Sequence, residues 1–191
     1  IQFYKDIQLI VNVIPGGGAV LGENAFVRLE GMDTIQIAGD KKKLEGMEVL
    51  VLGKILLGEE LADTSKPIEI ILPEGVENLT GKDQVNVTVD FDDNLETKTF
   101  VVTNIVKTAV PENMEVSIQT KEMRIKVRGT KSQIAQMKAS DLTVQVDFSD
   151  AEIGAGPYKA TIVVNSNFSA NVGAVGLYNV NATVTASAEA E

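Results

Sequence analysis

The chain has 191 residues and a net charge of −10, from 17 basic and 27 acidic side chains. This balance disfavours binding to nucleic acid or anionic lipid, because both partners require clustered Lys and Arg. The chain has no Cys and no His, which excludes disulfides and thiol catalysis and removes the commonest general base and transition-metal ligand. No segment approaches the roughly 20 apolar residues of a membrane span.

Alternating apolar and polar residues predict strands with one buried face along most of the chain. In chain order the apolar positions are Ile35 and Ile37; Val85, Val87, Val89 and Phe91; Met114, Val116 and Ile118; Met123, Ile125 and Val127; Leu142, Val144, Val146 and Phe148; and Val180, Ala182 and Val184. Intervening residues such as Thr88 and Arg128 are predicted to face away from the core. The predicted fold class is therefore mostly β.

Two short segments between strands, residues 41–47 and 131–137, resemble one or two helical turns. Leu44 with Met47, and Ile134 with Met137, have the i, i+3 spacing of a small apolar helix face. Both segments are too short to be stable helices on their own.

These segments belong to an internal repeat. Residue pairs separated by 90 positions are Gly39 and Gly129, Leu44 and Ile134, Met47 and Met137, and Pro67 and Pro157. Farther along, residues 85–89 match residues 180–184 at a separation of 95, which predicts five extra residues within the loop 165–176. The polar stretch 92–96 is predicted to be a short linker. The sequence therefore predicts two domains, 1–94 and 95–191.

The motifs of the repeat resemble those of the YbbR-like domain. The first copy carries Ile-Ile-Leu-Pro-Glu-Gly-Val-Glu at 70–77 and Val-Asn-Val-Thr-Val-Asp at 85–90. The second carries Val-Pro-Glu-Asn-Met-Glu-Val at 110–116, Ile-Lys-Val-Arg-Gly-Thr-Lys at 125–131, Leu-Thr-Val-Gln-Val-Asp-Phe-Ser at 142–149 and Gly-Ala-Gly-Pro-Tyr at 154–158. The first copy departs from the family over residues 1–34. It also has Val-Leu-Val-Leu-Gly at 49–53 where the second has the Val-Asp-Phe ending.

The resemblance implies two small antiparallel β domains in tandem and offers no catalytic residues to carry over. From the residues themselves, we expect neither a cofactor nor a metal. YbbR-like proteins usually carry an N-terminal membrane helix followed by several such domains outside the cytoplasm. The best-understood members resemble regulators of a membrane-bound diadenylate cyclase, which makes cyclic di-AMP. The resemblance therefore implies a non-enzymatic module on the outer face of a bacterial membrane, with that cyclase as protein partner and an anchor outside this chain.

An oxygen-rich group of side chains, Asp90, Asp92, Asp93 and Asn94, is the candidate metal site in the sequence. Calcium prefers such ligands. The spacing does not match an EF-hand, and strand alternation points Asp90 away from some of its neighbours. The sequence therefore favours no metal site here.

Catalytic chemistry has little support in the sequence. The glycine run 16–18 is not a phosphate-binding loop, because no Gly-Lys-Ser/Thr follows it, and a flexible hairpin or linker is expected instead. The remaining candidate acids are scattered at strand ends and turns, and none has an obviously apolar setting that would raise its pKa. These acids are Asp63, Asp83, Asp147, Asp150 and Glu152. We therefore expect a protein that is not an enzyme.

The inserted loop 165–176 is the candidate partner-contact surface, with Asn167, Phe168 and Tyr178 as the contact residues; an ordinary long hairpin is the alternative. A different function, cell-surface adhesion or carbohydrate binding by a scaffold-like β protein, would require exposed aromatic platforms. The aromatic content of 5% counts against it.

Overall fold

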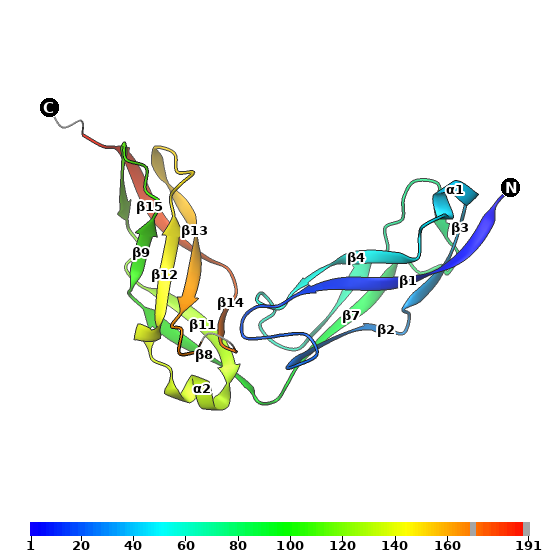
Figure 1. The fold of residues 1–191 in the computed structure, drawn as a ribbon, viewed down its shortest axis with the longest axis horizontal. Coiled ribbons are helices and arrows are strands. Elements are labelled where there is room, and N and C mark those ends of the chain that lie inside the picture. Colours follow the sequence, from blue (N-terminus) through cyan, green and yellow to red (C-terminus); the bar gives the residue numbers. More distant parts are fainter. Residues whose placement is uncertain (169–170, 189–191) are drawn as a thin grey trace. The chain divides into compact units, whose positions relative to one another are not determined.

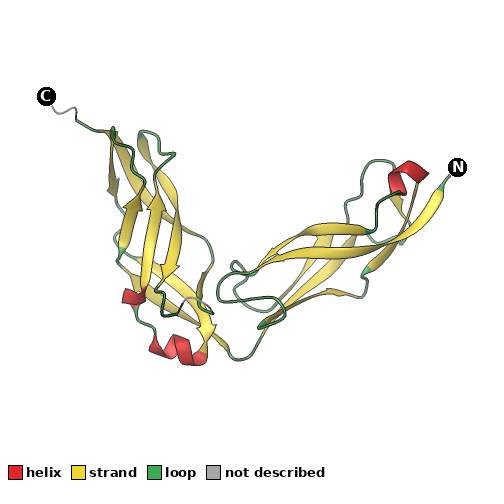
Figure 2. Cartoon of the chain, viewed as in Figure 1, coloured by secondary structure: helices red, strands yellow, loops and turns green. Residues whose placement is uncertain are grey.

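The computed structural model describes residues 1–168 and 171–188 and consists mainly of β-strands (Figures 1 and 2). The predicted mostly-β fold class is therefore confirmed. Two compact units divide the chain: the first unit comprises Ile1–Pro15 and Val20–Asp92, and the second unit comprises Gly16–Ala19 and Asp93–Glu191. Within the described residues, no helix has the length and apolar character needed to cross a membrane.

The first unit contains two small sheets and one short helix (Figure 1). Its elements are β1 (Phe3–Ile14), β2 (Ala25–Glu30), β3 (Thr34–Gly39), α1 (Lys41–Leu44), β4 (Val49–Leu56), β5 (Thr64–Glu69), β6 (Val76–Asn78) and β7 (Gln84–Phe91). One sheet has the order β4-β1-β3-β6 and the other β2-β7-β5. The first half of β1 pairs antiparallel with β3, and its second half pairs parallel with β4.

The second unit also contains two sheets, with the orders β10-β15-β13-β12-β9 and β14-β11-β8. Its elements are β8 (Leu95–Val102), β9 (Ile105–Thr108), β10 (Met114–Ile118), β11 (Met123–Thr130), α2 (Lys131–Gln136), a 3₁₀ turn (Ala139–Asp141), β12 (Leu142–Asp147), β13 (Gly154–Val164), β14 (Gly173–Val175) and β15 (Tyr178–Ala186). β8 pairs antiparallel with β11, and β9 pairs parallel with β12.

The two units share one topology. β8 and β9 together pair as β1 does, β11 pairs with β14 as β3 pairs with β6, and the order β10-β15-β13 repeats β2-β7-β5. The register also agrees, since Pro67 lies opposite Asn86 in the first unit and Pro157 lies opposite Asn181 in the second. The internal repeat predicted from the sequence is therefore confirmed.

One pairing differs between the units. In the second unit β12 and β13 form an antiparallel ladder from Leu142 opposite Val164 to Val146 opposite Ala160. In the first unit β4 ends one sheet and β5 ends the other, and no ladder joins them. β4 and β5 are therefore edge strands, whereas their counterparts are paired.

Each unit has its own apolar core. In the second unit, the predicted inward residues of β12 and β15 are buried, and Phe148 is fully buried as predicted. In the first unit, Leu44 of α1 packs with Ile7 and Ile37, so the short helix covers one end of that core. The prediction was wrong for Phe91, the last residue of β7, which is partly exposed and does not belong to the core cluster of the first unit.

Two polar residues predicted to face solvent are buried instead. Thr88 is 7% exposed, and its hydroxyl donates to Glu30 Oε1 at 2.5 Å. Arg128 is 2% exposed, and its Nε donates to the Gly17 carbonyl oxygen at 2.8 Å within the second unit. Both side chains have hydrogen-bond partners from segments distant in sequence, which strand alternation does not reveal.

Candidate interaction surfaces

The loop between β13 and β14 carries two of the three predicted contact residues. Asn167 is exposed, and its backbone N–H donates to Asn165 Oδ1 at 3.1 Å. The N–H of Phe168 donates to the Asn165 carbonyl oxygen at 2.9 Å, and the Phe168 side chain packs partly buried against the core. Residues 169–170 of the predicted loop lie outside the described residues. The described part is thus a turn organised around Asn165.

Tyr178, the third predicted contact residue, begins β15 and is partly buried against the core. Its hydroxyl donates to the Val175 carbonyl oxygen at 2.5 Å and accepts from the Lys126 N–H at 3.0 Å. Tyr178 therefore connects β15 to β14 and β11, and the neighbouring Leu177 is the exposed side chain. A contact between a partner and Asn167, Phe168 or Tyr178 remains a prediction.

The candidate calcium ligands Asp90, Asp92 and Asp93 are not gathered into a site. In the part of the chain that the structure describes, no group of three or more His, Cys, Asp or Glu side chains could hold a metal ion. Asp90 lies opposite Phe26 near the end of β7, and the Asp92 N–H donates to the Asn24 carbonyl oxygen at 2.8 Å.

The scattered acids named from the sequence are divided among separate places. Asp147 and Asp150 line a hollow of about 350 Å³ at the end of β12, beside Tyr158 and Lys159. Asp63 lines a different hollow in the first unit, and its Oδ1 accepts from the Phe91 N–H at 2.8 Å. Asp63 therefore lies in a different unit from Asp147 and Asp150.

Asp147 has the one carboxyl group whose pKa is clearly lowered among the described residues. The Ser149 N–H donates to Asp147 Oδ1 at 2.8 Å, and this backbone hydrogen bond, followed by one from the Ser149 side chain, lowers its pKa. Hydrogen bonds to a carboxylate favour its charged form. Asp147 is therefore better suited to accept structural hydrogen bonds than to act as a general acid at neutral pH.

The pKa of Asp147 in the folded chain is expected to lie below that of a model aspartate, which is about 3.9. The ionised group then stabilises the fold above the unfolded-state pKa, and this contribution is lost as pH falls through the folded-state pKa. A carboxyl NMR titration of the wild type and Ser149→Ala checks this. Removing the hydroxyl should raise the pKa of Asp147 only partly, because the larger backbone contribution remains. A full return to the model value in Ser149→Ala would contradict that order of causes.

Exposed apolar side chains and acidic charge both concentrate in the first unit. Among the described residues, the large exposed apolar side chains are Ile1, Phe3, Tyr4, Ile14, Leu21, Phe26, Val49, Val51, Leu61, Ile71 and Leu79 in the first unit, against Val101, Ile153, Val163 and Leu177 in the second. Residues 1–92 carry eight basic and sixteen acidic side chains, whereas residues 93–191 carry nine and eleven. The first unit thus exposes more large apolar side chains and carries a larger acidic excess than the second unit.

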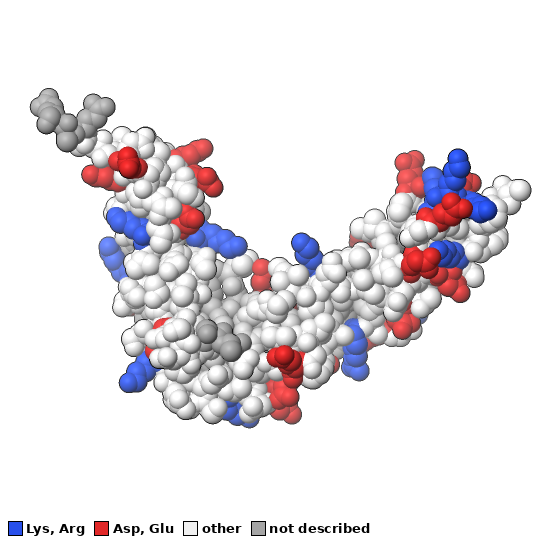
Figure 3. Space-filling view, viewed as in Figure 1, with Lys and Arg blue, Asp and Glu red and all other residues white. Residues whose placement is uncertain are grey.

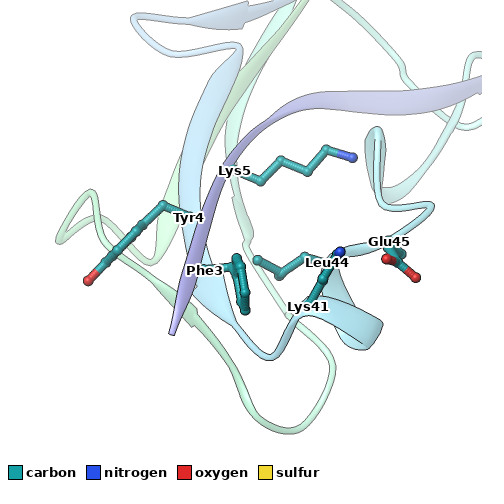
Figure 4. A pocket seen from close by; sticks show the side chains of 6 residues that line it. All are labelled: Phe3, Tyr4, Lys5, Lys41, Leu44 and Glu45. Atoms are coloured by element: carbon teal, nitrogen blue, oxygen red, sulfur yellow. The ribbon is translucent and has the colours of Figure 1, made fainter. Parts of the chain in front are cut away.

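The charges of the first unit are unevenly placed. On the face shown in Figure 3, they gather around α1 and the N-terminus, while the middle is mostly uncharged. Near α1 an open hollow of about 160 Å³ lies between the start of β1 and the helix. Its lining side chains include Phe3 and Leu44, which lie beside each other, while Tyr4 points away (Figure 4). Lys5, Lys41 and Glu45 also line the hollow.

The open edge of β4 is the feature that the sequence-based candidates missed. Val49 and Val51 are 43% and 48% exposed on this edge strand. A signal was present in the sequence, because residues 49–53 are where the first copy lacks the Val-Asp-Phe ending of the second. In the structure, however, residues 55–57 rather than 49–53 are equivalent to the Val-Asp-Phe ending, because the Leu57 N–H donates to the Ile14 carbonyl oxygen as the Phe148 N–H donates to that of Thr108.

Comparisons with known proteins give structural neighbours. No family model and no curated protein matches the chain. A YbbR-like domain from Listeria monocytogenes is 19% identical with a TM-score of 0.38, covering 50% of this chain and 99% of its own. A protein from Streptococcus thermophilus is 15% identical with a TM-score of 0.39, covering 50% of this chain and 89% of its own.

A YbbR-like protein from Streptococcus pneumoniae is 10% identical to the chain with a TM-score of 0.34. The match covers 98% of this chain and 96% of that one. Two of these neighbours are named for the family that the sequence motifs resemble. Among solved structures, the chain is thus similar to YbbR-like domains, over half of its length in one case and over 98% of it in another.

Proposed function

We propose that this chain is a non-catalytic, extracytoplasmic module of a membrane-anchored bacterial protein, and that it modulates a membrane-bound diadenylate cyclase. The observation that carries the proposal is the set of YbbR-like motifs, which is fuller in the second half of the sequence than in the first. Such motifs identify a structural family better than an activity. The partner is therefore taken from the family resemblance and not from a site in the chain.

The repeated topology supports treating both copies as the same kind of domain. Gly39 ends β3 and Gly129 lies near the end of β11, and each precedes a short helix whose apolar residue, Leu44 or Ile134, is buried. The motif glycines therefore occupy equivalent places in the two units.

Such a module would act by binding its protein partner directly. Strand edges and exposed apolar side chains are the surfaces through which β domains commonly bind other proteins. In the first unit these surfaces coincide with a strong excess of acidic residues. A protein partner whose contacting surface is apolar and basic is the best match for them.

Coexpression tests the proposal. The membrane-anchored parent protein is produced with the diadenylate cyclase of the same organism, in a host without its own cyclase, and cyclic di-AMP is measured. The control replaces residues 1–191 with unrelated β domains of equal length and keeps the anchor. We expect the cyclic di-AMP level to change only with residues 1–191 present, and the cyclase to co-purify. An unchanged level without co-purification would reject the proposal and favour adhesion or a scaffold.

A further inference from the structure

The outer edge of β4 is not paired with another strand, although β5, the counterpart of β13, lies close to part of β4. In the second unit the equivalent strand β12 is paired with β13 from Leu142–Val164 to Val146–Ala160. In the first unit, whose residues are all described, β4 pairs with β1 on one side and ends its sheet on the other. An edge strand presents unpaired N–H and C=O groups that can pair with another chain.

The hydrogen bonds to β1 indicate which residues of β4 face the open edge. The Gln8 N–H donates to the Glu48 carbonyl oxygen at 3.0 Å, so the backbone groups of Glu48 face β1. Neighbouring residues of a strand direct their backbone groups to opposite edges. Val49 and Val51 therefore direct their N–H and C=O groups outward, before the register with β1 shifts beyond Val51.

Side-chain burial shows what an added strand would cover. Leu50 and Leu52 of β4 pack against the core of the first unit but remain partly exposed. In contrast, Leu142 and Val144 of β12 are fully buried. The strand that fills the equivalent position, β13, runs antiparallel and places Ala160, Ile162 and Val164 opposite β12 residues. A suitable occupant of the β4 edge is thus an extended antiparallel strand with alternate apolar side chains.

Charge decides what kind of chain that strand belongs to. Acidic residues lie at both ends of β4, with Glu45 and Glu48 before it and Glu59, Glu60 and Asp63 after it. Lys5 pairs with Glu48 at 2.6 Å, and Lys66 pairs with Glu60, yet the first unit retains twice as many acidic as basic residues. A second copy of this chain would bring the same acidic surface and be repelled, whereas basic residues flanking a strand would be attracted.

We propose that the open edge of β4 binds an extended strand of another protein, apolar at alternate positions and flanked by Lys or Arg, by antiparallel β-augmentation. Backbone hydrogen bonds to Val49 and Val51 provide the pairing. The acidic residues at both ends of β4 favour a basic ligand. The inference deepens the proposed function. Only the assignment of this strand to the membrane partner rests on that function.

A synthetic peptide tests the binding directly. The probe has the sequence of residues 158–164, Tyr-Lys-Ala-Thr-Ile-Val-Val, with two lysines added at each end. A matched peptide has two glutamates at each end instead. By fluorescence anisotropy at low salt, we expect the lysine-flanked peptide to bind at least about tenfold more tightly, and its affinity to fall as salt is added. Absence of binding by the lysine-flanked peptide would overturn the proposal.

Two variants of Val51 locate the peptide. Val51→Pro removes the outward N–H but leaves the β1 side of the strand, and proline is tolerated on edge strands. Val51→Thr keeps the N–H and a strand-forming side chain. We expect Val51→Pro to weaken peptide binding at least about tenfold and Val51→Thr to change it less than about threefold. Val49→Pro serves as the second edge variant if circular dichroism shows that Val51→Pro is unfolded.

Peptide binding to folded Val51→Pro with the wild-type affinity would overturn the proposal. A concentration-dependent dimer that Val51→Pro abolishes, measured by light scattering, would assign the edge to a second copy and also overturn it. If the peptide binds as expected while cyclic di-AMP is unchanged in the coexpression experiment, the proposed function fails and the β4 binding edge stands.

Discussion

Replacing Phe148 with alanine is expected to lower the free energy of unfolding of the second unit by about 3–5 kcal/mol. Phe148 is fully buried within the core cluster that includes Leu142 and Val144. Its ring also lies 4.8 Å from the Tyr158 ring, centroid to centroid, at an interplanar angle of 54°. The substitution removes the buried ring and leaves a cavity that β12 and its paired neighbours cannot easily close.

This loss is large beside the roughly 5–15 kcal/mol that stabilises a typical domain. Urea unfolding gives its size, and hydrogen exchange read by mass spectrometry shows whether the loss falls on peptides from residues 93–191. Phe26→Ala is the matched control, because Phe26 is 49% exposed on β2 and its loss should cost no more than about 0.5 kcal/mol. Equal effects of the two substitutions would contradict the burial that distinguishes them.

Alanine at Gly129 or Gly39 is expected to destabilise the unit that contains it by about 1–3 kcal/mol, because each site lacks room for a methyl group. A Cβ at Gly129 would lie 2.8 Å from Val172 Cγ2 and 3.2 Å from the Asn171 carbonyl oxygen. Val172 is only 6% exposed, so its side chain cannot move into solvent. At Gly39 the added atom would lie 3.0 Å from the Gly75 carbonyl oxygen, so backbone must shift.

The control for this pair is Gly156→Ala on β13, where an added Cβ meets nothing within 4 Å. There, restricting the unfolded chain should leave stability unchanged or raise it by up to about 1 kcal/mol. Thermal unfolding of the three variants, with hydrogen exchange to separate the units, checks the result. If Gly129→Ala is as stable as Gly156→Ala, close packing does not explain the glycine in the YbbR-like motif.

Together, these substitutions test two different reasons why particular residues occur in the YbbR-like motifs. Gly39 and Gly129 share a place at the end of a strand because the returning segment before β6 or β14 passes close to the backbone. Phe148, by contrast, belongs to the Val-Asp-Phe ending that the second copy has and the first lacks. Both units nevertheless bury the residue at this place, because Leu57, whose N–H donates to the Ile14 carbonyl oxygen as the Phe148 N–H donates to that of Thr108, is 0% exposed.

Residue alternation and residue spacing were enough to predict the β class, the repeat and most of the core. The predicted inward residues Val180, Ala182 and Val184 are buried, and so are Leu44 and Ile134 of the short helices. Such features depend on contacts between neighbouring positions of one strand or turn, so their period is present in the sequence. The spacing of Pro67 and Pro157 in the repeat likewise predicted their equivalent positions in the ladders, where they lie opposite Asn86 and Asn181.

Only the tertiary structure decided which strands lack a partner and which polar residues are buried. Alternation assigns Thr88 and Arg128 to an outer face, but segments distant in sequence cover both side chains. Alternation also does not show that β4 and β5 end different sheets, whereas their counterparts β12 and β13 are paired. The physical reason is that strand periodicity is local, whereas hydrogen-bond pairing between strands and burial of the outer face depend on non-local neighbours.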